Sequence, residues 1–303
     1  MLSERTLSRR QFIAGSTLAV ATATLSGAEP PVAKGRGRFK IIGFIKPFQT
    51  VPFDEIASIA REVGWSGIEC PVRKGGAVEP ERVEEDLPKL IDALRGRELE
   101  LSVISTDVED IAGLTQKVLK TASKLGIPQY RLKHYYYDLS KPIASQLENF
   151  RAKLRDLAQL NQELNIQGSI QNHSGRNYVG AGVWDIWELI RDLDPKSMGV
   201  FFDIGHATIE GGLSWPIEAR LIEPFLATVS VKDFVWAKGE RGWRAEWCPL
   251  GEGMVNRQYF ETLAKSNFRG PITQQFEYQM GDRKEMIAAM QKDLGVLRKW
   301  LGA

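Results

Sequence analysis

The feature that most constrains this chain is a regular alternation of short apolar runs and longer amphipathic segments, which starts near residue 40. Eight runs have the length and the β-branched and aromatic content of buried strands, and a segment with helical spacing of its apolar residues follows each one. The expected strands are residues 40–46, 67–72, 99–105, 130–137, 166–172, 199–204, 227–232 and 271–277. The expected helices are residues 56–63, 81–97, 112–125, 143–164, 183–193, 215–225, 258–265 and 283–301.

Eight strand–helix units over residues 39–303 predict a single-domain (β/α)8 TIM barrel. The alternative is a doubly wound open sheet, which typically carries a glycine-rich phosphate loop when it binds a nucleotide. The chain contains neither a G-x-G-x-x-G nor a G-x-x-x-x-G-K-[ST] motif. We therefore expect the closed barrel.

Residues 1–28 have the features of a twin-arginine signal peptide. Arg9 and Arg10 precede an apolar stretch over residues 14–25, and small residues follow at 26–28. The stretch is too short and too rich in Ser and Thr for a membrane span, although an uncleaved anchor is the alternative. We expect cleavage, a linker over residues 29–38, and a protein that is periplasmic or otherwise exported by the twin-arginine route.

The charge of the mature chain argues against nucleic acid as its partner. Residues 1–28 contain three arginines and one glutamate, so their removal lowers the formal net charge from +2 to zero. Nucleic-acid-binding proteins are usually basic. Cys70 and Cys248 are too few for a disulfide framework and match no zinc spacing, and we expect two buried thiols rather than a pair.

Polar residues gather where the expected strands end, which is where the active sites of such barrels lie. All three histidines of the chain fall at these positions. At the sixth strand an apolar run opens directly into Asp203 and His206, a pairing used for metal binding or proton transfer, with a helix-capping Asp beside a packed His as the alternative. The strand-end candidates are Lys46, Glu69, Lys133, His134, Gln171, Asn172, His173, Asp203, His206, Lys232, Asp233 and Glu277.

These positions resemble motifs of the sugar phosphate isomerase/epimerase, or xylose isomerase-like, barrel superfamily. The likeness covers residues 40–303. Its markers are Gly67-Ile-Glu69, Gln171-Asn-His173, Asp203-Ile-Gly-His206, Val231-Lys-Asp233, Pro249-Leu-Gly-Glu-Gly253 and Phe276-Glu277-Tyr278. The resemblance implies the barrel fold and the transfer of a proton next to the carbonyl group of a carbohydrate or polyol derivative, through an enediolate or enolate.

The resemblance also implies one divalent metal ion, most often Mn²⁺ or Mg²⁺, held by Glu, Asp, His and Glu at the ends of strands five to eight. Asp203 and Glu277 match the second and fourth of these ligands, whereas Gln171 and Ser230 stand where the family has Glu and His. A Gln can offer an oxygen to a metal but cannot act as a general base at neutral pH. We expect a weaker or rearranged metal site with Asp203, Glu277, Gln171 and His173 as ligands, or a site without metal that works with Lys and His.

Four of the strand-end residues are the expected acid–base catalysts: Glu277, His206, Lys232 and Glu69. The ammonium groups of Lys46 and Lys133 suit an anionic or carbonyl-bearing substrate, with rim ion pairs as the alternative. The remaining expected substrate-binding residues are His134, Asn172, His173, Asp233 and Trp236. Several aromatic residues could stack on a sugar ring: Phe48, Tyr135, Tyr136, Trp236, Trp243 and Trp247. We expect the Trp-rich insertion, residues 234–247, to cover the pocket, with an oligomer contact as the alternative.

The sequence therefore predicts an exported isomerase- or epimerase-like enzyme with a small-molecule carbohydrate substrate and no membrane span after signal cleavage. A lyase or hydratase acting on an oxidised sugar is one alternative, because it starts from the same enolate. A non-catalytic sugar-binding barrel with a degenerate metal site is another, and Gln171 and Ser230 support it. A DNA-repair nuclease of this fold needs a multi-zinc centre, for which three histidines are too few. A homo-oligomer is compatible with the insertion.

Overall fold

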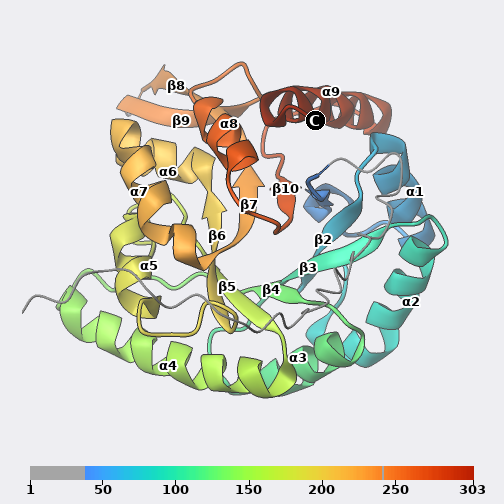
Figure 1. The fold of residues 1–303 in the computed structure, drawn as a ribbon. Coiled ribbons are helices and arrows are strands. Elements are labelled where there is room, and N and C mark those ends of the chain that lie inside the picture. The colour runs from blue at the N-terminus through green and yellow to red at the C-terminus, as the bar shows by residue number, and fades with distance from the viewer. Residues whose placement is uncertain (1–37, 241) are drawn as a thin grey trace, which may run out of the picture. The chain divides into compact units, whose positions relative to one another are not determined.

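A computed structural model describes residues 38–240 and 242–303, which contain a closed barrel of eight parallel strands with helices around it (Figure 1). The strands follow one another around the barrel in the order β1-β10-β7-β6-β5-β4-β3-β2. Their bounds are β1 (Ile41–Phe44), β2 (Gly67–Val72), β3 (Glu100–Thr106), β4 (Gln129–Arg131), β5 (Gln167–Gln171), β6 (Met198–Asp203), β7 (Leu226–Val231) and β10 (Ile272–Gln274). The predicted TIM barrel is confirmed, whereas the predicted signal peptide and linker lie outside the described residues, except for Arg38.

The helices alternate with the strands as the periodicity predicts. They are α1 (Phe53–Val63), α2 (Val83–Arg95), α3 (Thr115–Lys124), α4 (Ile143–Leu164), α5 (Val183–Ile190), α6 (Ile204–Gly211), α7 (Trp215–Ile222), α8 (Gln258–Lys265) and α9 (Arg283–Leu301). Short 3-10 turns occur at η1 (Lys46–Phe48), η2 (Pro80–Arg82), η3 (Gly212–Ser214) and η4 (Glu223–Phe225). Within the described part of the chain, no helix has the length and apolarity that crossing a membrane requires.

The core is divided by the barrel wall. The large core lies between the strands and the surrounding helices, and this is why the strands read as continuous apolar runs. Ile42, Val103 and Phe201 form a separate buried cluster. Because these three residues belong to β1, β3 and β6, which are not neighbours in the sheet, they can meet only inside the barrel. These three side chains therefore fill part of the barrel interior.

The structure differs from the leading expectation at three places. The fourth strand ends at Arg131 instead of extending to residue 137, and Tyr136 instead forms an isolated antiparallel bridge with Tyr178. Helix α6 starts immediately after β6, because the Asp203 side chain accepts the His206 N–H and caps the helix, as the alternative interpretation of this position predicted. The insertion forms an antiparallel hairpin of β8 (Asp233–Gly239) and β9 (Gly242–Cys248). The two thiols are unpaired, as expected, although Cys248 is only partly buried.

Candidate active site

Four ionisable side chains meet at the carboxyl ends of neighbouring strands. Asp203 is the last residue of β6, His206 lies in the first turn of α6, Lys232 directly follows β7, and Glu277 lies shortly after β10. The Lys232 Nζ atom is 2.8 Å from Glu277 Oε1 and 3.5 Å from Asp203 Oδ2. The His206 Nε2 atom is 3.8 Å from the same Asp203 oxygen. We call these four residues the strand-end cluster; its location is that of the active site in enzymes of this fold.

Asp203 is the buried anchor of the strand-end cluster. Its Oδ1 atom accepts a hydrogen bond of 3.0 Å from the backbone N–H of His206. Its Oδ2 atom accepts from Gln171 Nε2 at 3.1 Å and from Ser230 Oγ at 3.0 Å. The two residues that depart from the family pattern, Gln171 and Ser230, therefore both donate to Asp203. These two donors and the neighbouring Lys232 ammonium group occupy this carboxylate oxygen.

Glu277 is the accessible acid of the cluster, with a side chain that is 34% exposed. Burial alone would raise the pKa of this carboxyl, but the charge of Lys232 and its hydrogen bond outweigh that effect, so the pKa is lowered. Glu277 is consequently ionised at neutral pH. An ionised carboxylate at the open end of the barrel is suited to accept a proton from a bound substrate.

Lys232 is buried and held on several sides. Besides its two carboxylate neighbours, it lies against the Trp247 ring, with Nζ 4.3 Å from the ring centroid. A cation over an indole face is stabilised electrostatically. The ammonium group is thus fixed beside Glu277, where it can stabilise negative charge that develops on a substrate oxygen.

His206 is fully buried, and its two ring nitrogens have different surroundings. Nδ1 shares a hydrogen bond of 2.7 Å with Ser174 Oγ, whereas the buried Nε2 has no hydrogen-bond partner. Burial lowers the pKa of His206 well below its usual value, and the positive charge of Lys232 lowers it further. The imidazole is therefore neutral at pH 7, and it has one buried polar atom without a hydrogen-bond partner.

Aromatic rings form a wall beside the cluster. The His173 ring stacks on Tyr178 with centroids 4.3 Å apart, and its other neighbour is His206 at 3.9 Å. His134 packs edge-on against His173, and burial together with the charge of Arg131 lowers its pKa to about 2. The predicted substrate-binding residues His134 and His173 therefore lie with His206 in one group of neutral rings.

The hairpin supplies the indole that reaches the cluster. Trp247, on β9, lies perpendicular to the His206 ring at 5.2 Å and covers Lys232. Trp236, the predicted substrate-binding residue, is 43% exposed and packs edge-on against Phe234 instead. The insertion thus reaches the strand-end cluster through Trp247. No contact between Trp236 and the strand-end cluster supports the predicted binding role of Trp236.

The two predicted rim lysines have different positions. Lys133 points to the surface, where its Nζ atom lies 3.5 Å from Glu109 Oε2. This is the rim ion pair that the sequence left as the alternative. Lys46 is also exposed, at the start of η1, but its charge contributes to the lowered pKa of Glu277. The charge of Lys46 therefore acts on Glu277, whereas Lys133 is paired with Glu109.

Glu69 lies inside the barrel and apart from the strand-end cluster. Its Oε1 atom accepts from Ser105 Oγ and from Arg131 Nε at 3.2 Å. Its Oε2 atom accepts from Thr273 Oγ1 at 2.8 Å and from Gln275 Nε2 at 3.4 Å. We call Glu69 and these four partners the interior cluster. With no exposed surface and two donors on each oxygen, Glu69 is placed to support the barrel rather than to meet a substrate.

Arg131 is the member of the interior cluster that the sequence reasoning missed. Its guanidinium lies over the rings of Phe44 and Phe201, at 5.6 Å from each centroid. Its Nη1 atom is 3.3 Å from His134 Nε2, so that Arg131 links the interior cluster to the aromatic wall. A charged residue between the apolar Tyr130 and Leu132 was the signal that could have identified it.

Two further predicted substrate-binding residues are used within the protein. The Asn172 side chain bonds both the backbone N–H and the carbonyl oxygen of Asp203, at 2.7 Å and 2.9 Å, and so ties β5 to β6. Asp233 accepts four backbone N–H groups, from Phe234, Gly251, Gly253 and Val255. A Cβ atom at Gly253 would lie 2.3 Å from Asp233 Oδ1, so the loop can wrap this carboxylate only with Gly there. The polar atoms of Asn172 and Asp233 are thus paired within the protein, and their binding roles stay predictions.

The predicted metal ligands do not form a site that fits a divalent cation. Asp203 and Gln171 are in contact, but Gln171 presents its N–H group to Asp203, and Lys232 stands between Asp203 and Glu277. The fourth predicted ligand, His173, directs Nδ1 to the carbonyl oxygen of Ser174 at 2.8 Å. Across residues 38–240 and 242–303, no group of three or more His, Cys, Asp or Glu side chains is placed to hold a metal ion. A donor set of N–H, O–H and ammonium groups around Asp203 binds an anion, not a cation.

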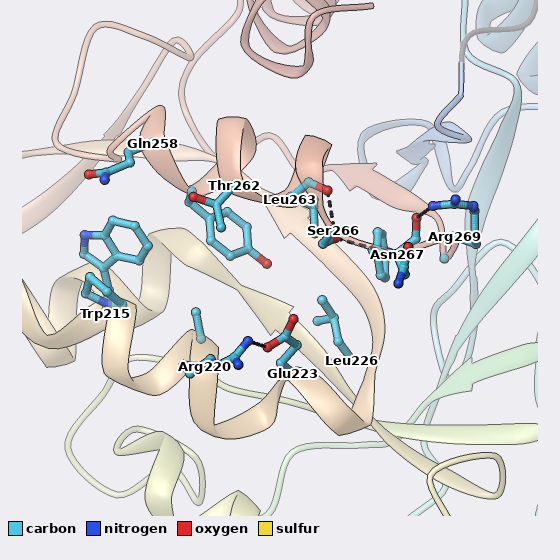
Figure 2. Close-up of a pocket in the computed structure, with 15 residues that line it drawn as sticks. Trp215, Arg220, Glu223, Leu226, Gln258, Thr262, Leu263, Ser266, Asn267 and Arg269 are labelled. Carbon is cyan, nitrogen blue, oxygen red and sulfur yellow. Dashed lines mark hydrogen bonds and ion pairs between the residues drawn. The ribbon is translucent and has the colours of Figure 1, made fainter. Parts of the chain in front are cut away.

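A groove lies on another part of the molecule, away from the strand-end cluster. It lies outside the barrel between α7 and α8, with a volume of about 490 Å³, and Trp215, Leu263 and Leu226 line it (Figure 2). Arg220 and Glu223 form an ion pair at its edge. Because Leu226 begins β7, this groove lies toward the amino ends of the strands. No member of the strand-end cluster borders it.

Comparison with known proteins places this geometry among related barrels. The family model described as xylose isomerase-like TIM barrel matches residues 57–300. Among curated proteins, an uncharacterized protein of Methanocaldococcus jannaschii is 27% identical over 128 residues, which make up 42% of this chain and 41% of that protein. The chain thus matches less than half the length of this relative.

Three solved structures share the fold. A probable 3-DHS dehydratase from Bacillus anthracis is 15% identical with a TM-score of 0.65, over 84% of this chain and 98% of that one. A 3-keto-D-glucoside 4-epimerase from E. coli is 15% identical with a TM-score of 0.65, over 86% and 99%. A xylose isomerase-like barrel from Mycobacterium smegmatis, in complex with magnesium, is 16% identical with a TM-score of 0.62, over 87% and 98%. At these identities the likeness concerns the fold alone.

Proposed function

Because this chain belongs to the xylose isomerase-like TIM barrel family, we propose that it is an enzyme that moves a proton next to the carbonyl group of a carbohydrate or polyol derivative. The single observation that carries the proposal is the contact of 2.8 Å between Lys232 Nζ and Glu277 Oε1 at the carboxyl ends of the strands. An ionised acid beside a fixed ammonium group is the pair that enolate chemistry needs.

The proposed reaction begins with a substrate whose carbonyl oxygen faces Lys232. Glu277 takes the proton from the neighbouring carbon, and the electrons of the broken C–H bond form the enolate, whose negative oxygen Lys232 stabilises. In an isomerisation, Glu277 returns the proton to the former carbonyl carbon while the hydroxyl proton of the neighbouring carbon passes to the enolate oxygen, so that the carbonyl group is re-formed on the neighbouring carbon. Neutral His206, with its unpartnered Nε2, would orient a substrate hydroxyl group.

The position of Gln171 bears on the type of reaction. Epimerisation in this family uses two acids on opposite faces of the substrate, and Gln171, where the second acid would stand, is engaged with Asp203. We therefore favour a one-base reaction, such as an isomerisation in which one carboxylate moves the proton. Elimination of water from a keto sugar is the second candidate, because it needs one base and the same enolate. The fold shared with a probable dehydratase supports keeping it.

Location and partners belong to the same proposal. Export by the twin-arginine route is supported by Arg9, Arg10 and the apolar stretch after them in the sequence. A small carbohydrate as substrate is supported by the fold shared with a 3-keto-D-glucoside 4-epimerase.

Solvent exchange tests the proposed function. The full chain is incubated in D₂O with a panel of aldoses, ketoses and keto sugars, and each sugar is followed by NMR and mass spectrometry. We expect deuterium at the carbon next to the carbonyl of at least one sugar, or loss of water from a keto sugar. Glu277→Gln should abolish the reaction, whereas Lys133→Gln, which removes a surface lysine, should leave it unchanged. Sugar binding without exchange or elimination anywhere in the panel would establish the non-catalytic barrel instead.

A further inference from the structure

Asp203 and Glu277, which match two metal ligands of the family, share a positive charge that the chain itself supplies. Lys232 Nζ lies 2.8 Å from Glu277 Oε1 and 3.5 Å from Asp203 Oδ2. Its side chain is 3% exposed, and the Trp247 ring closes it off from another side. A buried carboxylate such as Asp203, next to a second carboxylate, favours a compensating cation, and here a covalently attached one is already present.

We propose that the Lys232 ammonium group takes the place of the divalent cation, and that this chain therefore excludes divalent metal ions from the strand-end cluster. The inference rests on the proposed function only for the location of the site. It concerns which cation the site holds, and metal binding can be measured without any substrate.

The two departures from the family pattern act in the same direction. Gln171 in place of Glu removes one negative charge, so that Asp203, Glu277 and Lys232 together carry a formal charge of −1. A divalent ion added to these groups would bring their total charge, Lys232 included, to +1 and would place the ion next to the ammonium group. Such an excess of buried like charge is unfavourable.

Ser230 supports this arrangement. Residues 230 and 232 are two apart, so their side chains point to the same side of the chain where it leaves β7. Ser230 Oγ donates to Asp203 Oδ2 at 3.0 Å, and Lys232 approaches the same oxygen. An imidazole at position 230 would present a metal ligand to this site. The Ser230 hydroxyl group instead donates to the acid.

Binding of Mn²⁺ to the full-length chain tests the inference. Protein stripped with EDTA is titrated with Mn²⁺ alone, free Mn²⁺ is followed by electron paramagnetic resonance, and the melting temperature is recorded in parallel. We expect no stoichiometric binding by the wild type and no rise in its melting temperature. Lys232→Gln, which leaves both acids without a cation, should gain about tenfold or more in Mn²⁺ affinity. Lys232→Arg keeps the charge and should gain nothing, as should Lys133→Gln, which removes a surface lysine.

A variant with the family ligands restored extends the test. Gln171→Glu, Ser230→His and Lys232→Gln combined should bind Mn²⁺ more tightly than Lys232→Gln alone. One tightly bound Mn²⁺ per wild-type chain overturns the inference, and this outcome does not depend on any variant folding. A folded Lys232→Gln protein that gains no affinity also overturns it. Failure of the deuterium exchange in a wild type that rejects Mn²⁺ would instead contradict only the proposed function.

Discussion

The interior cluster and the strand-end cluster both pair buried carboxylates with one cation, but they differ in how completely their polar atoms are satisfied. Each oxygen of Glu69 accepts from two donors, and Glu69 has no exposed surface. In the strand-end cluster, Glu277 is 34% exposed and His206 Nε2 is buried without a partner. A fully paired carboxylate stabilises the fold, whereas an incompletely paired group keeps capacity for a ligand. This difference separates a structural acid from a reactive one in the same barrel.

The sharpest test of the comparison is to remove the charge of Glu277. Glu277→Gln should reduce the rate of deuterium exchange by about 10²–10⁴-fold, the usual contribution of a general base. The free energy of unfolding should change by less than about 1 kcal/mol, because Glu277 is partly exposed and Lys232 keeps Asp203 as a neighbour. Exchange rates by NMR and urea titrations measure the two quantities. A rate near that of the wild type would place the base elsewhere.

The opposite pattern is expected inside the barrel. Glu69→Gln leaves Arg131 buried without its counter-charge, and breaking such a pair typically lowers the free energy of unfolding by about 3–5 kcal/mol. Urea unfolding followed by circular dichroism measures this loss. Glu109→Gln, in the exposed pair with Lys133, is the matched control and should lose less than about 1 kcal/mol. A Glu69→Gln protein of normal stability but no activity would return Glu69 to the catalytic residues.

Asp233 is another well-paired carboxylate, which accepts backbone N–H groups of the loop over residues 249–255. Asp233→Asn replaces an acceptor oxygen with an N–H group that faces backbone donors, and we expect a loss of about 2 kcal/mol in the free energy of unfolding. The affinity for any sugar identified in the panel should stay the same, because this carboxylate points into its own loop. Unfolding titrations and calorimetric binding distinguish the two effects. A loss of affinity at unchanged stability would support the predicted binding role.

The smallest effect concerns pH. The pKa of His206 is lowered in the folded protein, so below the ordinary histidine pKa the unfolded chain binds a proton that the folded chain does not. With respect to His206, the free energy of unfolding is therefore at its full value above about pH 6.5, and it declines as the pH falls below this value. In His206→Gln, the slope of the unfolding free energy between pH 6 and pH 5 should shrink by up to about 1.4 kcal/mol per pH unit, one proton's worth. Equal slopes in the two proteins would show that His206 is protonated in the fold.

The barrel could be predicted because the sequence patterns that specify its strands and helices lie within short segments of the chain. Apolar runs and helical spacing repeat along the chain, and parallel strands bring their carboxyl ends to one edge, so Asp203, His206, Lys232 and Glu277 could be grouped from sequence. The buried and fully paired environment of Glu69 could not be predicted. Its partners come from β3, β4 and the region of β10, and no local pattern in the sequence pairs them. The start of α6 at Asp203 could be given only as an alternative, since a single cap decides it.

The hairpin register carries one further consequence. Trp247 pairs with Phe234, and neighbouring residues of a strand point to opposite faces, so a shift of one residue would turn Trp247 away and bring Glu246 to its place. Lys232 would then meet a carboxylate where it now meets an indole. A single insertion or deletion near the hairpin turn could therefore change the charge of the site without replacing any residue in it. A change in the length of this turn would therefore be one way for related sequences to change the chemistry of the site.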